Sequence, residues 1–410
     1  MDKGAACVVC NGCPENRVDA ARAETYLLNI GYHTVKNWRE ADLILFNGCA
    51  GNEQRTGHSL SVIKEIQENK KPNQQLVVWG CLPKIFPETL KKEYQGLTSE
   101  VEFPALQQLL NTSEPEDLTA GNYLVDPWPY DKNNASWLAR YEGPFLSRSL
   151  KRLAVPWVNY VNRHFNLAPA GDKSTFYIKT STGCRGKCAY CVVPQSRGTI
   201  KSKPVEKVVN EFQEGLRRGF KRFSLLGTDL GSYGADIGCN LCDLLKELVK
   251  QEGNFKINLR NVHPRFLMGM MNEFIPILET EKIRYIETPA ESGSDRILKL
   301  MNRPYTIQEY KEYINTLRRA YPNIIIRSQI IAGFPTETED DFQKSMKLLD
   351  ELVFDYVEVY EYSEMPKTLS EKIKPKVPDA VKKQRYMAMY KKALLNRTPR
   401  KIKRIILRRT

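Results

Sequence analysis

The sequence lacks the two features that would direct this chain into or across a membrane. It has no uninterrupted apolar run long enough to span a bilayer, although 41% of its 410 residues are hydrophobic. Its first residues, MDKGAACVVC, lack the charged region, apolar core and cleavage site of an export leader. We therefore expect a cytoplasmic protein without a membrane partner, long enough for two or three domains.

Cysteine is too scarce for a disulfide framework, yet it is clustered. Ten cysteines among 410 residues fall far below the density of small disulfide-rich domains. In a reducing compartment, clustered thiols favour metal binding over disulfide bridges. The ten are Cys7, Cys10, Cys13, Cys49, Cys81, Cys184, Cys188, Cys191, Cys239 and Cys242. Their grouping predicts metal centres.

Acidic residues are missing from the end of the chain. Residues 381–410 contain twelve Lys or Arg and no Asp or Glu, so they account for most of the net charge of +14. A basic stretch such as RTPRKIKRIILRRT, residues 397–410, suits a polyanion, and RNA is the partner that we expect. The alternative is a solvated helix end or tail without a partner.

Residues 1–111 alternate short apolar runs with helical patterns, which predicts a small parallel α/β sheet. The runs ACVVC, ADLILFNGC and QQLVVWGC each lead into a cysteine, namely Cys13, Cys49 and Cys81. Ligands of open α/β sheets gather at the carboxyl ends of the strands. Three thiols that are distant in sequence can therefore meet at one point.

The rest of the chain divides into three segments. Residues 112–172 show no clean periodicity and are expected to form an irregular linker with one helix near 149–165. From 173 to 378 strands and helices alternate again, which predicts a complete or partial (β/α) barrel. Residues 379–410 are expected to form a basic helix and tail. The fold class is thus α/β throughout.

The loop STGCRGKCAYCVVPQSRG, residues 181–198, holds three cysteines but lacks a fourth. Cys184, Cys188 and Cys191 can bind three irons of a 4Fe–4S cube, and a fourth thiolate would close that cube. The missing ligand leaves one iron open to a substrate or cofactor. A structural zinc site normally needs four ligands, and no nearby Cys or His supplies the fourth.

The segment CRGKCAYC, with Tyr190 before the last cysteine, resembles the radical S-adenosylmethionine signature. The resemblance implies that the open iron chelates S-adenosylmethionine, whose reductive cleavage yields a 5′-deoxyadenosyl radical that removes hydrogen from a C–H bond. It also implies a low-potential electron donor such as a flavodoxin or ferredoxin.

Further segments are similar to the methylthiotransferase branch of that superfamily. The stretches NGCPENRVDAARAE, ADLILFNGCA and VVWGCLPK each place one cysteine at one of the family's three positions. The stretches RGTIKSKPVEKVV, PAESGSDRILKLMNRPYT and IIAGFPTETEDDF resemble other motifs of the family. The resemblance implies that Cys13, Cys49 and Cys81 hold a second 4Fe–4S cluster, which takes part in sulfur insertion. It implies replacement of C–H by C–S–CH3 with two S-adenosylmethionine molecules consumed.

The segment LLGTDLGSYGADIG, residues 225–238, looks most like the branch that acts on C2 of threonylcarbamoyladenosine beside the tRNA anticodon. Two departures leave the substrate open. The family's usual terminal β-barrel for RNA has no strand-rich counterpart after residue 379, and the usual Gln and Asp of two motifs are Glu291 and Gln329. The alternatives are the same chemistry on a peptide, protein or metabolite, a non-catalytic iron–sulfur RNA-binding protein, and a zinc protein.

Several residues at predicted strand ends are candidates for binding S-adenosylmethionine. They are Gly227, Thr228, Asp229, Ser292, Gly333 and Pro335, with Ser294 and Phe334 beside them. A turn that needs small residues is the competing explanation for the first three. Arg197 is expected to meet a carboxylate or phosphate, or to form a surface ion pair.

The remaining cysteines and one histidine are expected to be structural. Cys7 and Cys10 stand three apart on a strand and should point to opposite faces. Cys239 and Cys242 form a C-x-x-C pair that suits either a redox or metal role or two idle thiols, and the second is favoured. His263 is expected to be a turn residue rather than a base.

Overall fold

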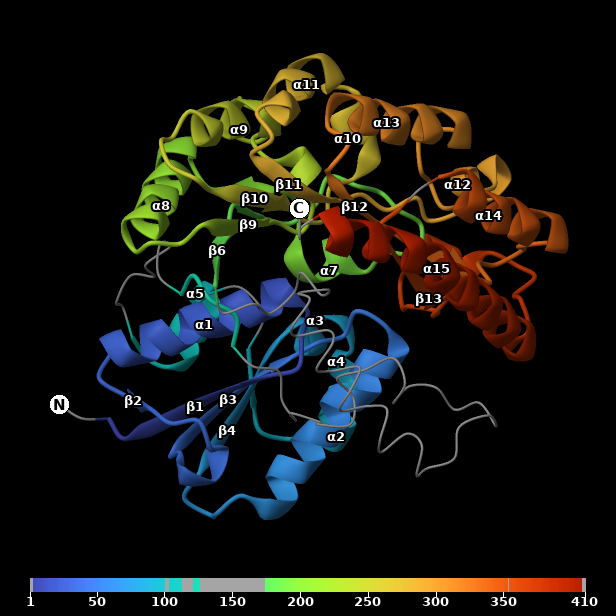
Figure 1. The fold of residues 1–410 in the computed structure, drawn as a ribbon. Coiled ribbons are helices and arrows are strands. Elements are labelled where there is room, and N and C mark those ends of the chain that lie inside the picture. The colour runs from blue at the N-terminus through green and yellow to red at the C-terminus, as the bar shows by residue number, and fades with distance from the viewer. Residues whose placement is uncertain (1–2, 100–102, 113–120, 126–173, 353, 408–410) are drawn as a thin grey trace.

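The computed structural model describes residues 3–99, 103–112, 121–125, 174–352 and 354–407. Within them the chain builds two main parallel sheets, each followed or flanked by helices (Figure 1). Most of the expected linker, including the helix expected at 149–165, lies outside the described residues. No helix in the described ranges combines the length and apolar character that crossing a bilayer requires.

The N-terminal sheet has five strands in the order β2-β1-β3-β4-β5, and all neighbouring pairs are parallel. Its three central strands are almost fully buried, as apolar runs covered on both faces should be. The strands are β1 Ala5–Cys10, β2 His33–Thr34, β3 Leu43–Gly48, β4 Gln75–Gly80 and β5 Leu97–Thr98. The helices are α1 Pro14–Asn29, η1 Trp38–Glu40, α2 Glu53–Asn69, α3 Cys81–Ile85, α4 Pro87–Glu93 and α5 Phe103–Leu109.

The second sheet has six strands in the order β13-β12-β11-β10-β9-β6, again all parallel. An open row of six parallel strands is a partial barrel, so the second half of the predicted fold class is confirmed. The strands are β6 Thr175–Lys179, β9 Arg222–Leu226, β10 Lys256–Leu259, β11 Ile283–Glu287, β12 Ile325–Ala332 and β13 Tyr356–Glu361.

Helices cover the outer face of this open barrel, as the arc from α8 to α14 in Figure 1 shows. They are α8 Val205–Arg217, α9 Leu241–Val249, α10 Pro264–Met268, α11 Met271–Glu279, α12 Asp295–Leu300, α13 Ile307–Ala320 and α14 Glu339–Glu351. Between this arc and the sheet lies the largest apolar core, which includes Phe212, Phe223 and Phe255. The other face of the sheet therefore turns toward the N-terminal part of the chain.

Short elements shape the loops near that inner face. They are α7 Val193–Arg197, the 3-10 turns η2 Leu230–Ser232 and η3 Leu369–Lys372, and the antiparallel pair β7 Ser181–Thr182 with β8 Lys201–Ser202. On the inner face, Val18 of α1 packs with Tyr177 of β6 and Leu226 of β9. Helix α1 thus joins the two sheets.

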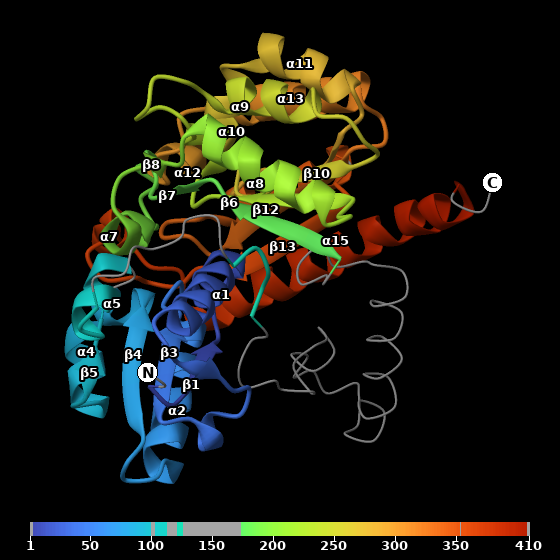
Figure 2. The same cartoon turned by 90° about the vertical axis from the view of Figure 1, so that its left-hand side faces the viewer.

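The last helix, α15 Asp379–Leu407, packs on the edge of the barrel. Met389 and Ala393 pack against Ile330 of β12 and Val359 of β13, so the first half of the helix extends the barrel's core. Figure 2 shows its far end projecting away from the rest of the molecule. The domain boundaries given above stay a prediction.

Candidate functional site

The N-terminal cysteines follow three neighbouring strands at the same edge of the sheet. Cys49 and Cys81 come directly after β3 and β4, and Cys13 lies three residues beyond the end of β1. The Sγ atoms of Cys13 and Cys81 both lie 3.8 Å from Oδ1 of Asn16. The backbone N–H of Cys49 donates to Oδ1 of Asn11 at 3.0 Å, also beside β1. The structure therefore brings the three thiols together as the topology predicted.

Two arginines face this first set of thiols. Arg197 donates to Oδ1 of Asn16, the atom that both Sγ atoms approach. Arg55 of α2 lies beside Cys49 and Cys13; burial opposes its charge, but those thiols raise the pKa of its guanidinium. Positive charge at this point offsets the charge that thiolate ligands bring to a buried metal centre.

The three-cysteine loop is held by backbone hydrogen bonds on both sides. The pairs Ser181–Ser202 and Thr182–Lys201 close it at its base, and the N–H of Cys184 donates to the carbonyl of Gly198 at 3.2 Å. Further along, Ala189 N–H donates to the Met301 carbonyl at 2.9 Å. The three Cys side chains are partly exposed, so they remain accessible to metal ions and to a small ligand.

Polar side chains from distant strands approach the individual thiols of this loop. Arg303 donates to Sγ of Cys188 at 3.3 Å, and Nε2 of His263 lies 3.8 Å from the same sulfur. Cys184 Sγ lies 3.9 Å from Oδ2 of Asp229. No sequence pattern indicated Arg303 or this position of His263, which directly precedes α10. Burial lowers the pKa of His263 to about 2, so the imidazole is neutral.

A buried polar network joins the two cysteine sets. Arg197, six residues after Cys191, is only 5% exposed, and its Nη1 donates to Oδ2 of Asp19 at 2.8 Å. Asp19 also pairs with Lys179 of β6. Burial alone would raise the pKa of Asp19, but the positive charges of Lys179 and Arg197 lower it. Arg197 therefore meets carboxylates, as one expectation held, but in the interior rather than at the surface.

Thr228 and its neighbours extend the network toward the barrel. Thr228 Oγ1 accepts from Gly183 N–H at 3.2 Å and donates to Oε2 of Glu15 at 3.0 Å. Asn261 Nδ2 donates to the other Glu15 oxygen at 2.9 Å and to the Gly227 carbonyl at 3.2 Å. Asp229 accepts from the backbone N–H groups of Gly231 and His263, and burial raises its pKa to about 6. Gly227, Thr228 and Asp229 thus lie beside the cysteine loop.

The other predicted cofactor residues have contacts elsewhere. The Ser292 hydroxyl lies 3.4 Å from that of Ser345 on α14, and Ser294 donates to Asp341 on the same helix. A Cβ on Gly333 would meet Lys382 of α15, and Pro335 is buried in the same turn. The contacts found for these residues join outer helices to the sheet, and their part in binding S-adenosylmethionine stays a prediction.

The two residues that depart from the family motifs, Glu291 and Gln329, also have hydrogen-bond partners. Glu291, at a positive φ of 66°, accepts from Arg303 at 3.0 Å. Gln329 donates to Glu287 at 2.6 Å. Glu291 is buried and Gln329 is partly buried, and both form polar pairs with residues of the barrel.

The remaining four cysteines pack as apolar residues. Cys7 and Cys10 belong to the cores on opposite faces of the N-terminal sheet, which confirms the alternation expected for that strand. Cys242 is fully buried in the barrel core and Cys239 packs against it. All ten cysteines are free thiols.

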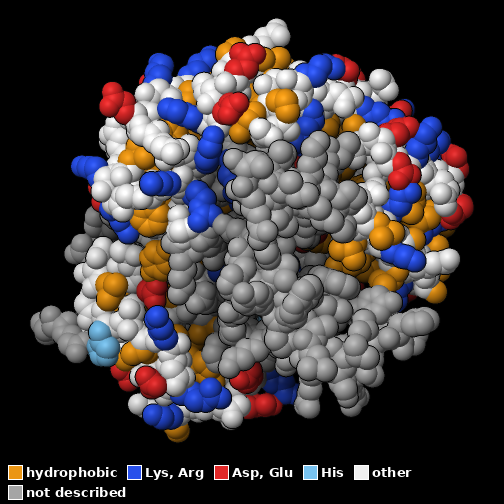
Figure 3. Space-filling view, in the orientation of Figure 1, with side chains coloured by type: hydrophobic (Ala, Val, Ile, Leu, Met, Phe, Trp, Pro, Cys, Tyr) orange, Lys and Arg blue, Asp and Glu red, His pale blue; other side chains and the backbone are white. Residues whose placement is uncertain are grey.

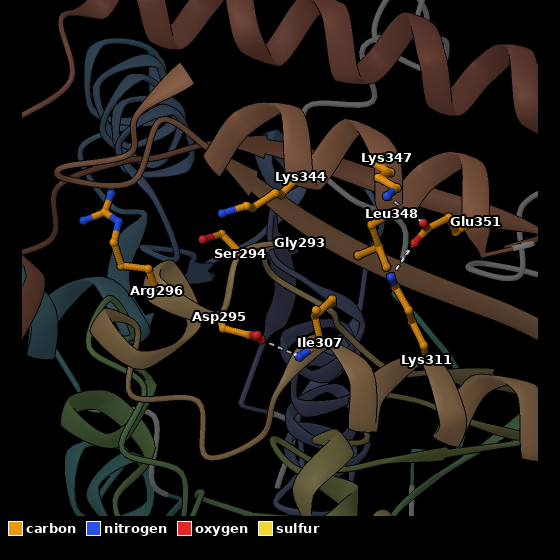
Figure 4. Close-up of a pocket in the computed structure, with 10 residues that line it drawn as sticks. All are labelled: Gly293, Ser294, Asp295, Arg296, Ile307, Lys311, Lys344, Lys347, Leu348 and Glu351. Carbon is orange, nitrogen blue, oxygen red and sulfur yellow. Dashed lines mark hydrogen bonds and ion pairs between the residues drawn. The ribbon is translucent and has the colours of Figure 1, made fainter. Parts of the chain in front are cut away.

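A cavity of about 270 Å³ lies between α12, α13 and α14 (Figure 4). Its charged lining includes Lys311 and Lys347, which both pair with Glu351, while Arg296 pairs with Asp341. The ten residues that line it include no cysteine, and Ser294 is the one cofactor candidate among them. This cavity belongs to the outer helical layer and not to the cysteine site.

Charged side chains on the face shown in Figure 3 are of both signs and interspersed over the barrel. Lys392 of α15, for example, pairs with Asp350 of α14 at 2.6 Å. The basic stretch 397–410 that the sequence linked to RNA is described only as helix backbone to Leu407. Its side chains lie outside the described residues.

Both sets of thiols fit an iron–sulfur cluster in their chemistry. Burial raises the pKa of Cys13 and Cys191 to about 12, so these thiols keep their protons until a metal binds. Metal binding then releases the protons. No group of three or more His, Cys, Asp or Glu in the described ranges is gathered closely enough for one metal ion. Each thiolate of a cubane cluster binds a separate iron.

Comparison with known proteins gives matches over both sheets. Residues 178–349 match the family model described as the radical SAM superfamily, and residues 6–100 match uncharacterized protein family UPF0004. The threonylcarbamoyladenosine tRNA methylthiotransferase of Aquifex aeolicus is 31% identical over 380 residues, 91% of this chain and 84% of that protein. The ribosomal protein uS12 methylthiotransferase of Thermodesulfovibrio yellowstonii is 29% identical over 381 residues, 92% and 80% of the two chains.

A solved structure shares the fold at low sequence identity. It is the radical S-adenosylmethionine methyltransferase TsrM of Kitasatospora setae, with a TM-score of 0.59 and 14% identity over 90% of this chain and 77% of that one. This likeness concerns the fold alone. It agrees with an α/β chain in which a parallel sheet precedes an open barrel.

Proposed function

Because this chain belongs to the radical S-adenosylmethionine methylthiotransferase family, we propose that it modifies a tRNA base. The product would be the 2-methylthio form of threonylcarbamoyladenosine beside the anticodon. The chain is an enzyme of that family, with S-adenosylmethionine and 4Fe–4S clusters as its cofactors. The observation that carries the proposal is the pair of three-thiol sets joined through Arg197 and Asn16.

We assign one cluster to each set of thiols. Cys184, Cys188 and Cys191 would hold the cluster that leaves an iron open for S-adenosylmethionine, and Cys13, Cys49 and Cys81 would hold the second. Bound there, the two clusters supply reductive cleavage of S-adenosylmethionine and the insertion of sulfur. An external low-potential donor such as a flavodoxin or ferredoxin would supply the electron.

The chain's own residues would position these groups and exclude water. Arg303 donates to Cys188, and Asp229 with Thr228 lies beside Cys184, where a positively charged amino group of the cofactor would find an acceptor. Arg197 ties the loop after Cys191 to Asn16 beside Cys13 and Cys81. These contacts fix the distance between the two sets, which suits one substrate that reacts at both.

One group of relatives supports the choice of a tRNA base as the substrate. The Aquifex aeolicus relative is named as a threonylcarbamoyladenosine tRNA methylthiotransferase. The segment 225–238 of this chain resembles the branch of the family that modifies this base. The basic residues of 381–410 suit the phosphates of RNA.

The deciding experiment is mass spectrometry of tRNA nucleosides from cells with and without the gene. We expect the 2-methylthio form of threonylcarbamoyladenosine to disappear and unmodified threonylcarbamoyladenosine to accumulate in the deletion. Restoring the gene with Cys188→Ala should not restore the product, whereas the unaltered gene should. An unchanged 2-methylthio pool would refute the tRNA proposal. Formation of 5′-deoxyadenosine under reduction tests the radical chemistry separately.

A second candidate is the same reaction on a protein, peptide or small metabolite. The uS12 methylthiotransferase relative favours a protein among these. Mass spectrometry of ribosomal proteins from the same two strains distinguishes this candidate, since a methylthio group on a protein would be lost in the deletion while the tRNA pool stayed constant.

A further inference from the structure

Three charged side chains form a buried cluster on the inner face of the barrel. Glu287 ends β11 and is 2% exposed. Its Oε2 lies 3.2 Å from Nη2 of Arg260, which follows β10, and 3.6 Å from Nη1 of Arg327 on β12. Two guanidinium groups thus share one carboxylate oxygen. Glu358 of β13 pairs with Arg327 from a more exposed position.

The hydrogen-bonding capacity of Glu287 is already used inside the protein. It accepts from the hydroxyl of Tyr285 at 3.1 Å and from Nε2 of Gln329 at 2.6 Å, and it forms ion pairs with the two arginines. Within the described part of the chain, Glu287 is the carboxylate that pairs with Arg260. Arg327 also pairs with Glu358, so Arg260 is the arginine that depends on the shared carboxylate alone among the described residues.

Each arginine keeps a donor without an acceptor. Nη1 of Arg260 and Nε of Arg327 are buried and have no hydrogen-bond partner among the described residues, and the two side chains are 6% and 11% exposed. A buried charged donor left unsatisfied is destabilising. One of these donors follows β10 and the other lies on β12, on either side of β11, and both are left for an acceptor from outside the chain.

The two arginines lie between the two cysteine sets. Asn261, next to Arg260, donates to the Gly227 carbonyl, and Thr228 accepts from Gly183 in the cysteine loop. On the other side, the charges of Arg327 and Arg55 both act on the hydroxyl of Tyr360, and Arg55 lies beside Cys49. Arg260 follows the end of β10 and Glu287 ends β11, which is the edge of the sheet at which barrel enzymes bind substrates.

We propose that Arg260 and Arg327 form a subsite for a carboxylate of the substrate. The inference rests on the proposed function, because the threonylcarbamoyl group of the modified adenosine ends in a carboxylate. Planar guanidinium groups match a carboxylate with two parallel hydrogen bonds. The arginines then act as specificity residues that distinguish this base from an adenosine without the acid.

The test compares the free nucleoside threonylcarbamoyladenosine with its methyl ester, which removes the charge but keeps the shape. Binding is measured by equilibrium dialysis against the full chain reconstituted with iron and sulfide. We expect the unaltered protein to bind the acid about tenfold or more tightly than the ester, since hydrogen bonds to charged groups contribute about 1.5–3 kcal/mol. This comparison does not depend on whether any variant folds.

Variants then assign the preference to the arginines. Arg260→Gln should bind acid and ester equally, and Arg260→Lys should retain part of the preference. The exposed Arg319→Gln, at 64% exposure in its own ion pair, should behave as the unaltered protein. Circular dichroism and iron content check that each variant is folded and loaded.

Three results would overturn the subsite. The first is equal binding of acid and ester by the unaltered protein. The second is weaker binding of both by Arg260→Gln to the same extent, as a merely structural residue would give. The third is weaker binding of S-adenosylmethionine by Arg260→Gln with the acid preference kept, which would mean that the arginines bind the carboxylate of the cofactor. Loss of the 2-methylthio product from tRNA is scored separately. An acid preference that depends on Arg260, without that product in cells, would preserve the subsite and refute the proposed function.

Discussion

Replacing Asp19 by Asn should loosen the contact between α1 and the barrel more than any surface change. Asp19 is 4% exposed and accepts from both Lys179 and Arg197, so the amide would leave two buried cations without their shared carboxylate. Removing one partner of a buried ion pair costs about 3–5 kcal/mol. Since each 1.4 kcal/mol is tenfold in an equilibrium constant, local opening should become roughly a hundredfold to several thousandfold more frequent.

Hydrogen exchange of the α1 and α7 amides, followed by mass spectrometry, measures that opening directly. The control is Asp340→Asn, whose 74%-exposed carboxylate pairs with Lys344 at 2.7 Å and should change stability by less than about 0.5 kcal/mol. The double variant Asp19→Asn with Lys179→Met removes one uncompensated cation and should recover part of the loss. Equal exchange in Asp19→Asn and Asp340→Asn would refute the conclusion that this buried network joins the two sheets.

Three further predictions concern the loop, one carboxyl group and the second cluster. Gly183→Ala should lower the iron content of the three-cysteine loop, because its Cβ would lie 1.9 Å from the Thr199 carbonyl oxygen at a φ of +81°; Gly57→Ala, on α2 with open space around it and no positive φ, should keep the iron. Burial raises the pKa of Glu337 to about 7, so its contribution to stability is present at low pH and is lost as the pH rises from about 4.5 through 7. In urea unfolding, the stability of the unaltered protein relative to that of Glu337→Gln should fall by about 3 kcal/mol over that range, and a difference that stays constant with pH would contradict this. Cys49→Ala should reduce the iron content of the reconstituted chain from about eight to about four per chain, while Cys242→Ala should leave it unchanged.

The sequence was sufficient to predict where the N-terminal thiols meet. An apolar run buried on both faces can be recognised from composition, and parallel strands place their carboxyl ends at one edge. The cysteines after β1, β3 and β4 therefore converge without any knowledge of side-chain contacts. The open barrel followed from the same alternation of strands and helices.

The polar neighbours of the thiols could not be predicted in this way. Arg303 lies 115 residues beyond Cys188, and its contact depends on how the turn after α12 meets the cysteine loop. Asn16 is close to Cys13 in sequence, but its contact with Cys81 depends on the register between β1, β3 and β4. Sequence periodicity shows which face a residue occupies, and it does not show which side chain from another strand shares that face.

The cysteine loop is fastened by main-chain hydrogen bonds at its base and at Ala189, none of which involves a thiol. Loss of a single thiol would leave every one of these bonds in place, so the attachment of the loop to the barrel does not depend on its cysteines.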